Sequence, residues 1–386
     1  MPRNDLSRSL VAFHQDSTLV AVVELSLKRW LVAGLVPGVA RKPLKKQDAD
    51  PDALLKLLYR WRDEAVKAGK TIARIVVAFE AGRDGFWLAR WLRARQIEAY
   101  VIHPSSVPVP REHRRAKTDR IDTQLLERSF LGWLRGERKH CSMAAVPTAA
   151  EEDARRPSRE HQRLREESTA LISRMKSTLV RFGIRNFNVK LVKASERLEA
   201  LRGPEGAPLP PNTLAEMRRD MARLRLVREQ MKIIEKTRAE RLVKAPREGT
   251  NPMVLMLARV MGIGIETADM LVHEVLMRNL RDRRAVARYA GITGAPDASG
   301  NKRREKGLAR AGNARVRRGL VQLAWRWLTF QKDSALAQWF RQRTASARGD
   351  IRKTMIVALA RKLLIALWRY VTLGQAPQGA VLRPAQ

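Results

Sequence analysis

The sequence has 386 residues, with 76 Lys or Arg against 39 Asp or Glu, so its formal net charge is +37. Such a charge draws a protein to polyanions, which makes nucleic acid the first candidate partner and an anionic membrane surface the second. No apolar run approaches the ~20 residues that span a bilayer. The single cysteine excludes an intrachain disulfide and a multi-cysteine zinc site. We expect a cytoplasmic protein of two or three domains, without a membrane partner.

The first part of the chain alternates predicted strands and helices. Residues 17–24 and 28–34 are rich in β-formers and predict a hairpin. A helix over 50–67 follows, in which Asp50 is a good N-cap and Pro51 suits the first helical position. The apolar run 73–79 and residues 98–102 predict buried strands, with a helix over 86–95 between them. This order predicts an α/β domain with a mixed sheet.

Four carboxylates lie where such a domain gathers functional side chains. Glu24 and Glu80 end the first strand and the apolar strand, and the carboxyl ends of strands are where sites form in α/β sheets. Asp119 and Asp122 are three residues apart, so a helix beginning near Thr118 would hold both on one face. Clustered carboxylates repel one another, and two divalent ions, Mg²⁺ or Mn²⁺, would offset that repulsion and assist phosphodiester chemistry. The four acids suggest a ribonuclease-H-like fold.

Plainer interpretations of these acids remain open. A solvated turn or an ordinary helix start explains each acid alone, because acids favour the first turn of a helix. Asp16 competes with Glu24 for the first position, although it precedes the apolar strand. Upstream of the Asp pair, a basic run could hold a phosphate backbone, and it contains Arg111, His113, Arg114, Arg115 and Lys117.

Residues 146–248 change character and predict two long helices. The charged run 151–181 carries apolar residues at near-helical spacing, and a loop rich in Gly and Pro follows at 203–211. The second run has apolar residues at three- and four-residue steps, namely Leu214, Met217, Met221, Leu224, Val227, Met231 and Ile234. This stripe predicts a coiled-coil-like antiparallel pair, packed against the first helix, a second subunit, or both.

Residues 249–375 predict an all-α domain, with a loose tail over 376–386. Gly262 and Gly264 open a helix and could let backbone N–H groups approach a phosphate, as in helix-hairpin-helix modules, although a tight turn fits as well. A flexible loop over 291–300 carries Ser299 beside dense positive charge, which suits phosphoester transfer, whereas a polar loop with a DNA-facing patch is the plainer interpretation. The basic cluster consists of Lys302, Arg303, Arg304, Lys306, Arg310, Arg315, Arg317 and Arg318.

Several segments, in the right order, resemble the DEDD-type transposases of bacterial insertion sequences. They are 101–104, 117–122, 262–264, 289–293, Ser299-Gly300 and Gly312-Asn313. The resemblance implies a RuvC-like catalytic domain over 1–145 and a serine-bearing transposase domain over 249–375. It implies that the four acids bind Mg²⁺ and that Ser299 becomes covalently joined to DNA. The family's first acid is Asp, so Glu24 departs from the pattern.

The resemblance also implies the partners. They are DNA at the element ends and target, a bridge RNA as guide, and further copies of the chain, as dimers that pair into tetramers. We therefore expect a DNA transposase or recombinase. A RuvC-like structure-selective endonuclease, using the four acids and water, has no need of Ser299. A non-catalytic nucleic-acid scaffold fits poorly, because acids that face a polyanion are costly unless they hold metal.

Overall fold

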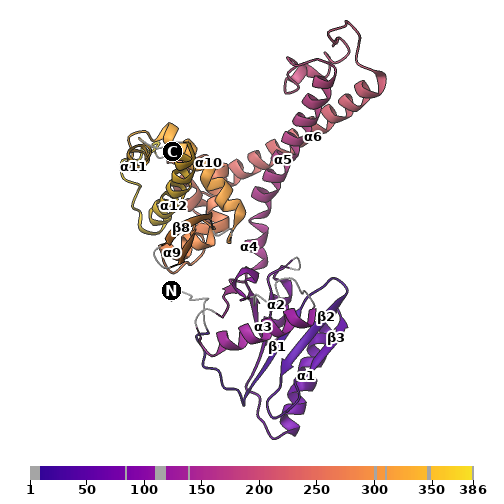
Figure 1. Ribbon diagram of the computed structural model, residues 1–386, viewed down its shortest axis with the longest axis vertical. Helices are drawn as coiled ribbons and strands as arrows, with labels where there is room; N and C mark the ends of the chain where they lie inside the picture. The colour runs from indigo at the N-terminus through magenta and orange to yellow at the C-terminus, as the bar shows by residue number, and fades with distance from the viewer. Residues whose placement is uncertain are drawn as a thin grey trace. The chain divides into compact units, whose positions relative to one another are not determined.

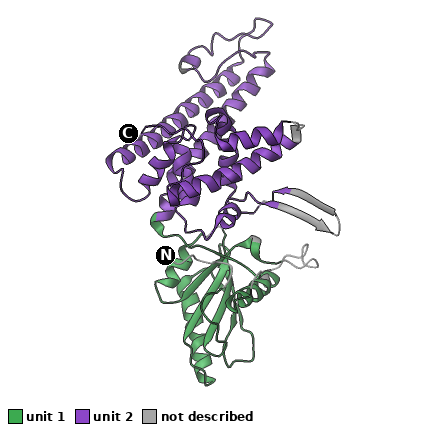
Figure 2. Cartoon of the chain, turned by 90° about the vertical axis from the view of Figure 1, so that its left-hand side faces the viewer, with its two compact units in different colours: residues 1–150 green, residues 151–386 purple. Residues whose placement is uncertain are grey.

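The computed structural model describes residues 9–82, 85–108, 119–137, 140–299, 302–308, 311–345 and 349–384, without the side chains of residues 105, 119, 192, 295–299, 302–306 and 349–350. The chain forms two compact units, Met1–Ala150 and Glu151–Gln386 (Figure 2). None of the helices within the described ranges is long and apolar enough to cross a membrane.

A six-stranded mixed sheet organises the first unit (Figure 1). Its strands, in sheet order, are β3 (Leu44–Asp48), β2 (Arg29–Leu35), β1 (Thr18–Glu24), β4 (Arg74–Glu80), β5 (Glu98–Ile102) and β6 (Met143–Ala144). β1 pairs antiparallel with β2 and parallel with β4, and β4 pairs parallel with β5. The expected hairpin, buried strands and mixed sheet are therefore confirmed. The edge strands β3 and β6 were not predicted.

Helices cover both faces of this sheet. α1 (Pro51–Lys67) and α2 (Trp87–Arg93) pack on one face and α3 (Asp119–Leu134) on the other. Asp50 caps α1 as expected, because its side chain accepts a hydrogen bond from the backbone N–H of Asp52 at 3.0 Å. Gly34 in β2 makes room for the buried Trp61 of α1, since a Cβ at residue 34 would lie 2.6 Å from the indole ring.

Two long helices begin the second unit, after the short α4 (Ala149–Asp153). α5 (Arg156–Arg181) and α6 (Pro211–Lys244) lie side by side (Figure 1). The predicted stripe on α6 packs against α5, in a core that includes Met217, Met221, Leu224 and Val227 from α6 and Leu164, Leu171, Met175 and Leu179 from α5. The expectation that the stripe packs against the first helix is confirmed. The connection 182–210 contributes Val189, Leu198 and Leu209 to the same core.

The remainder of the second unit is mostly helical, but the expected all-α architecture is wrong in one part. Residues 294–308 form the antiparallel pair β7 (Gly294–Ser299) and β8 (Lys302–Leu308), where we expected a flexible loop. Cross-strand backbone bonds define this hairpin, and its charged residues and Pro296 hide its strand character. The helices are α7 (Asn251–Ala258), α8 (Ile265–Leu271), the π-helix η4 (Val272–Leu276), α9 (Arg283–Tyr289), α10 (Ala314–Phe330), α11 (Ala335–Thr344) and α12 (Gly349–Leu373).

The expected loose tail is also wrong for the residues after Gly374 that the structure describes. The backbone N–H of Met261 donates to the carbonyl of Val381 at 3.0 Å. The buried amide of Gln331 donates to the carbonyls of Met261 and Val381 and accepts from the N–H of Val381 at 2.7 Å. The tail is thus held by hydrogen bonds to the turn before α8 and the end of α10.

Candidate active site

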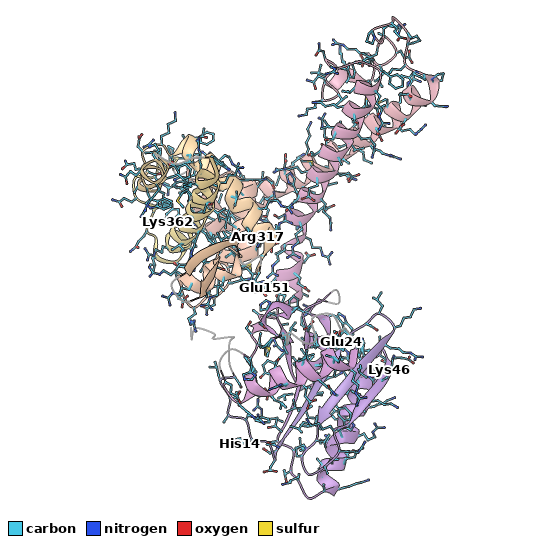
Figure 3. All side chains as sticks on the ribbon, in the orientation of Figure 1. His14, Glu24, Lys46, Glu151, Arg317 and Lys362 are labelled. Carbon is cyan, nitrogen blue, oxygen red and sulfur yellow. The ribbon has the colours of Figure 1, made fainter. Side chains whose placement is uncertain are left out.

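Glu24 and Glu80 lie next to each other at the carboxyl edge of the sheet. β1 and β4 are parallel neighbours, and Val23 pairs with Phe79. The next residues, Glu24 and Glu80, are therefore opposite each other on the two strands. Neighbouring strands are about 4.8 Å apart. Both acids are half-buried, and Glu24 is labelled in Figure 3.

Both acids belong to the face of the sheet that α3 covers. Side chains alternate between the two faces along a strand. Val22 in β1 and Ala78 in β4 lie in the core with residues of α3, whereas Val23 and Phe79 lie in the core with α1 and α2. Glu24 is two residues after Val22, and Glu80 two after Ala78, so alternation assigns both to the α3 face.

α3 runs antiparallel to β1 and β4. Near its end, the carbonyl of Trp133 accepts from the N–H of Ser9 at 3.0 Å. Arg74, at the start of β4, donates to the carbonyl of Ala12 at 3.1 Å, so residues 9–12 and the end of α3 lie at the amino edge of the sheet. A helix of 16 residues is about 24 Å long, close to the ~23 Å of a seven-residue strand. The first turn of α3 therefore lies toward the carboxyl edge.

That first turn carries the other two predicted acids. Asp122 is half-buried and lies four residues before Leu126, a core residue on the face of α3 that meets the sheet. The side chain of Asp119 lies outside the described residues. Glu24, Glu80 and Asp122 share one edge, but within the described side chains they do not form a trio with ligand atoms within 4.8 Å of one another.

Ser299 is the last residue of β7, paired with Lys302 at the start of β8. The same register pairs Asp297 with Arg304 and Ala298 with Arg303, so basic residues occupy the strand opposite the serine. The side chains of this part of the hairpin lie outside the described residues, as do Arg310 and the predicted basic residues Arg111, His113, Arg114, Arg115 and Lys117.

Two glycines fix the base of this hairpin. Gly291 and Gly312 have φ of +68° and +85°, and a Cβ on either would collide with backbone of the other side of the base. Asn313 then caps α10, because its side chain accepts from the N–H of Arg315 at 3.1 Å. Arg317 donates to the carbonyls of Gly291 and Ala311, at 3.4 and 3.3 Å. Residues 311–313, which lead into α10, are thus tightly held.

A buried acid ties this turn to the long helix α5. Glu274, in the π-helix, is 1% exposed. Arg159 of α5 donates to both of its carboxylate oxygens, at 2.8 and 3.1 Å, and the Asn313 amide donates to it at 3.0 Å. Glu274 is not among the residues predicted from the sequence, although an acid inside the mostly apolar stretch 270–277 (MLVHEVLM) is a signal of a buried, partnered charge. π-Helical turns are frequent at functional sites.

Replacing Glu274 with Gln should lower the free energy of unfolding by about 1.5–3 kcal/mol, because charged hydrogen bonds to Arg159 and Asn313 are lost in a buried position. Urea denaturation at pH 7 measures this effect. Glu166→Gln is the matched control, since Glu166 pairs with Arg318 at 2.6 Å on the surface and should be almost neutral. Equal effects of the two substitutions would contradict a stabilising role for the buried contacts of Glu274 with Arg159 and Asn313, which we call the Glu274 clamp.

The stabilising effect of Glu274 should disappear in acid. Burial alone would raise the pKa of Glu274, but the bonds from Arg159 and Asn313 outweigh burial and hold the pKa below its ordinary value. A depressed folded-state pKa means that the contribution is complete above about pH 4.3, the unfolded value, and is lost as pH falls through the folded-state pKa. Urea midpoints below pH 4.3 should therefore fall more steeply in the wild type than in Glu274→Gln.

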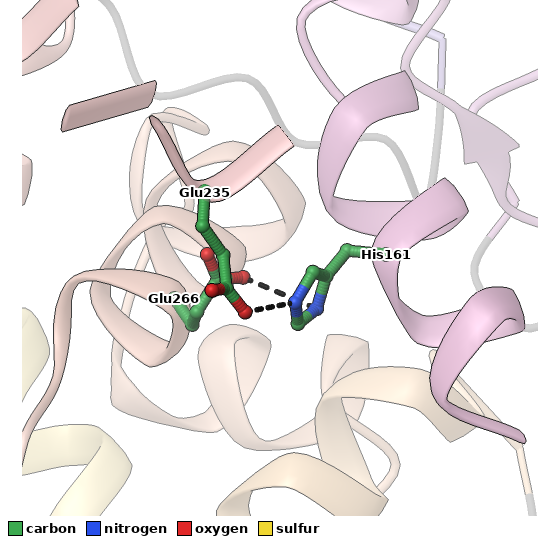
Figure 4. Close-up of side chains that lie close together, drawn as sticks. All are labelled: His161, Glu235 and Glu266. Carbon is green, nitrogen blue, oxygen red and sulfur yellow. Dashed lines mark hydrogen bonds and ion pairs between the residues drawn. The ribbon is translucent and has the colours of Figure 1, made fainter. Parts of the chain in front are cut away.

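A second polar cluster lies where α5, α6 and α8 meet (Figure 4). His161 Nε2 lies 2.7 Å from a carboxylate oxygen of Glu235, and its Nδ1 lies 3.4 Å from Glu266. Within the described side chains, this is the one trio with metal-ligand spacing. However, the buried Arg238 is already paired with Glu266. We interpret the cluster as an ion-pair network that joins three helices.

The other predicted nucleic-acid contacts in this unit are engaged within the protein. Arg315 is half-buried and donates to the carbonyl and hydroxyl of Ser158 in α5. Arg318 pairs with Glu166, and Arg317 (labelled in Figure 3) holds the hairpin base. Gly262 has φ of +89° and turns the chain beside Phe330, and Gly264 precedes the first residue of α8. This is the turn between two helices that we expected.

Comparison with known proteins decides the family. A family model described as "Transposase IS116/IS110/IS902 family" matches residues 255–340, from α7 through the hairpin to α11. "Putative transposase y4rJ" of Sinorhizobium fredii (strain NBRC 101917 / NGR234) is 40% identical over 372 residues, which cover 94% of this chain and 93% of that protein. The chain belongs to the IS116/IS110/IS902 family of transposases. It is an enzyme of DNA cleavage and transfer, and the expectation of a DNA transposase is confirmed.

The segment that the family model matches includes the hairpin that carries Ser299. The matched segment contains β7, β8, the π-helix and the Gly312-Asn313 turn. The similarity to the Sinorhizobium relative extends over nearly the whole chain, so it also includes the sheet that carries Glu24 and Glu80. Because the chain belongs to a family of enzymes, the alternative interpretation as a non-catalytic nucleic-acid scaffold is excluded.

Proposed function

We propose that this transposase recombines insertion-sequence DNA, and that two sets of residues catalyse the reaction: the acids at the sheet edge, and Ser299. The observation that carries the proposal is the parallel register of β1 and β4, which sets Glu24 beside Glu80 on the face that α3 covers. Three half-buried acids at one edge can ligate a divalent cation together, and such a cation would offset their mutual repulsion. The RuvC-like character of the unit is part of this proposal.

The acids fit a divalent cation by their chemistry. Carboxylate oxygens are the ligands that Mg²⁺ and Mn²⁺ prefer, and the edge of the sheet is where α/β domains bind ligands. We assign Glu24, Glu80, Asp119 and Asp122 as the residues that would hold the metal. When bound, it would neutralise charge on a DNA phosphate during cleavage. Glu24 in place of the family's Asp keeps the carboxylate on a longer side chain.

Ser299 would act as the nucleophile. Its oxygen attacks a DNA phosphorus and gives up its proton, while the bond from that phosphorus to a sugar oxygen breaks and the sugar oxygen takes up a proton. One phosphoester replaces another, so the strand can be rejoined without a high-energy cofactor. Basic residues on β8, opposite Ser299 in the hairpin register, support the binding of the phosphate.

RNA guidance and oligomerisation complete the proposal. The net charge of +37 exceeds what the DNA contacts of one small site require, and it supports a second polyanion such as a guide RNA.

Leu226 and Ile233 on α6 are 55% and 57% exposed and seven residues apart, so they form an apolar pair on one side of the helix. This pair supports a dimer through α6. Light scattering should give twice the chain mass, and Leu226→Ser with Ile233→Ser should halve it.

The function is tested by reconstitution. Purified transposase, element-end DNA and RNA transcribed from the DNA beside the gene should yield recombined product in Mg²⁺. Product should be absent when the RNA is omitted or replaced by an unrelated RNA of equal length. Cleavage of branched DNA without RNA, and without strand joining, would instead support the structure-selective endonuclease.

A further inference from the structure

A cavity lies at the end of the α5–α6 pair where the two helices are connected, away from the residues discussed above. Its volume is about 390 Å³, and its wall is made by the last turns of α5 and by residues 184–190 of the connection. We call the α5–α6 pair with its connection 182–210 the arm, and this cavity the arm-tip pocket. The residues on which the argument depends are Lys176, Arg185, Asn186, Phe187, Asn188 and Lys190. This volume is in the range of small-ligand sites.

The arm-tip pocket is strongly positive. The segment 168–195 contains six Lys or Arg and not one Asp or Glu. Some cations of the α5–α6 pair are neutralised, because Arg174 pairs with the buried Asp220 at 2.7 Å and Arg218 pairs with Glu199. In the part of the chain whose ion pairs are known, Lys176, Arg185 and Lys190 have no carboxylate within 4.0 Å. Three unpaired cations around a hollow favour an anionic ligand.

The uncharged groups of the wall indicate which anion. Phe187 is half-buried against the core of the arm, so its ring is held by packing and presents an aromatic surface to the pocket. Two amides, Asn186 and Asn188, lie on either side of it, and the Asn188 side chain accepts from the N–H of Lys190 at 3.0 Å, which fixes that turn. Aromatic rings stack on unpaired bases, and Asn amides bond base edges.

We propose that the arm-tip pocket binds an unpaired nucleotide of a single-stranded nucleic acid, with Phe187 against the base and the three cations on the adjoining phosphates. A base within a duplex is stacked on both sides and cannot offer its face to Phe187, so the pocket selects unpaired segments. The strand is RNA or DNA, and the two are told apart by the experiment. The inference does not depend on Ser299 or the four acids, so either proposal can fail without the other.

The test measures binding of the full chain to fluorescent single strands, in RNA and DNA forms of the same sequence, with excess unlabelled duplex to occupy other sites. One variant combines Lys176→Gln, Arg185→Gln and Lys190→Gln. Its matched control combines Arg219→Gln, Lys232→Gln and Lys244→Gln, which remove the same two Lys and one Arg from exposed positions of α6 outside the pocket. Phe187→Leu keeps an apolar side chain but removes the ring. Circular dichroism checks that each variant is folded.

The pocket variant should weaken single-strand binding about tenfold or more, and should reduce the slope of log K against log salt by about 2, at ~0.7 per phosphate contact. The control variant should change the affinity much less. Phe187→Leu should weaken single-strand binding about tenfold and leave duplex binding unchanged. Tighter binding of the RNA form identifies RNA as the ligand, and equal binding identifies any unpaired strand. Equal loss in the two triple variants, an unaffected Phe187→Leu, or equal displacement by polyglutamate would overturn the proposal.

Discussion

Asp122→Asn should slow DNA strand cleavage at least about a hundredfold while the protein remains folded and bound to DNA. Asn keeps the shape of the side chain but removes its charge, so it can neither hold a divalent cation strongly nor repel the acids across from it. Asp122 is half-buried on the first turn of α3, on the face that meets the sheet. The measurement is the initial rate of cleavage of end-labelled element DNA in Mg²⁺, at saturating protein.

Two controls make this result specific. Asp63→Asn applies the same change to an exposed residue of α1 in the same unit and should cleave at the wild-type rate. Glu24→Gln should behave like Asp122→Asn, whereas Asp16→Asn should cleave normally, because Asp16 pairs with Lys70 at 2.8 Å before β1 begins. Wild-type cleavage by Asp122→Asn would show that the acids at this edge are not catalytic.

Elements with strong local patterns could be predicted from the sequence. α1 has an N-cap, a proline at its first position and a continuous apolar face, and the structure reproduces the predicted bounds within one residue. β4 is an apolar run because both of its faces are covered, by α1 and α2 on one side and α3 on the other. The apolar stripe of α6 likewise allowed its packing against α5 to be predicted.

Elements whose cause is distant in the sequence could not be predicted. β3 (LKKQD) is an exposed edge strand that exists because β2 pairs with it, and the hairpin β7–β8 is defined by backbone pairing between two strands that lack a β-type sequence pattern. The Glu274 clamp joins residues 115 positions apart. The positions of the acids at strand ends were predictable, but their shared face follows from the register of β1 with β4 and from the packing of α3.

Ser299→Ala should abolish covalent attachment of the transposase to DNA and, with it, strand joining. The substitution removes one oxygen from the end of β7 and leaves the backbone pairing with Lys302 available. Fold, DNA binding and salt dependence should therefore match the wild type. Thr293→Ala, six residues earlier, removes a hydroxyl from the same segment and should leave joining intact. A denaturing gel of protein incubated with labelled DNA and Mg²⁺ shows the attachment as a shifted band.

Mass spectrometry of that band tests the central proposal most directly. Trypsin should release residues 289–302 as one peptide, since Arg288 and Lys302 bound it with no other Lys or Arg between them. After nuclease digestion, we predict that this peptide carries a nucleotide phosphate and that fragmentation assigns it to Ser299 rather than to Tyr289 or Thr293. A nucleotide on any other residue, or full recombination by Ser299→Ala without a covalent band, would contradict the proposed serine mechanism.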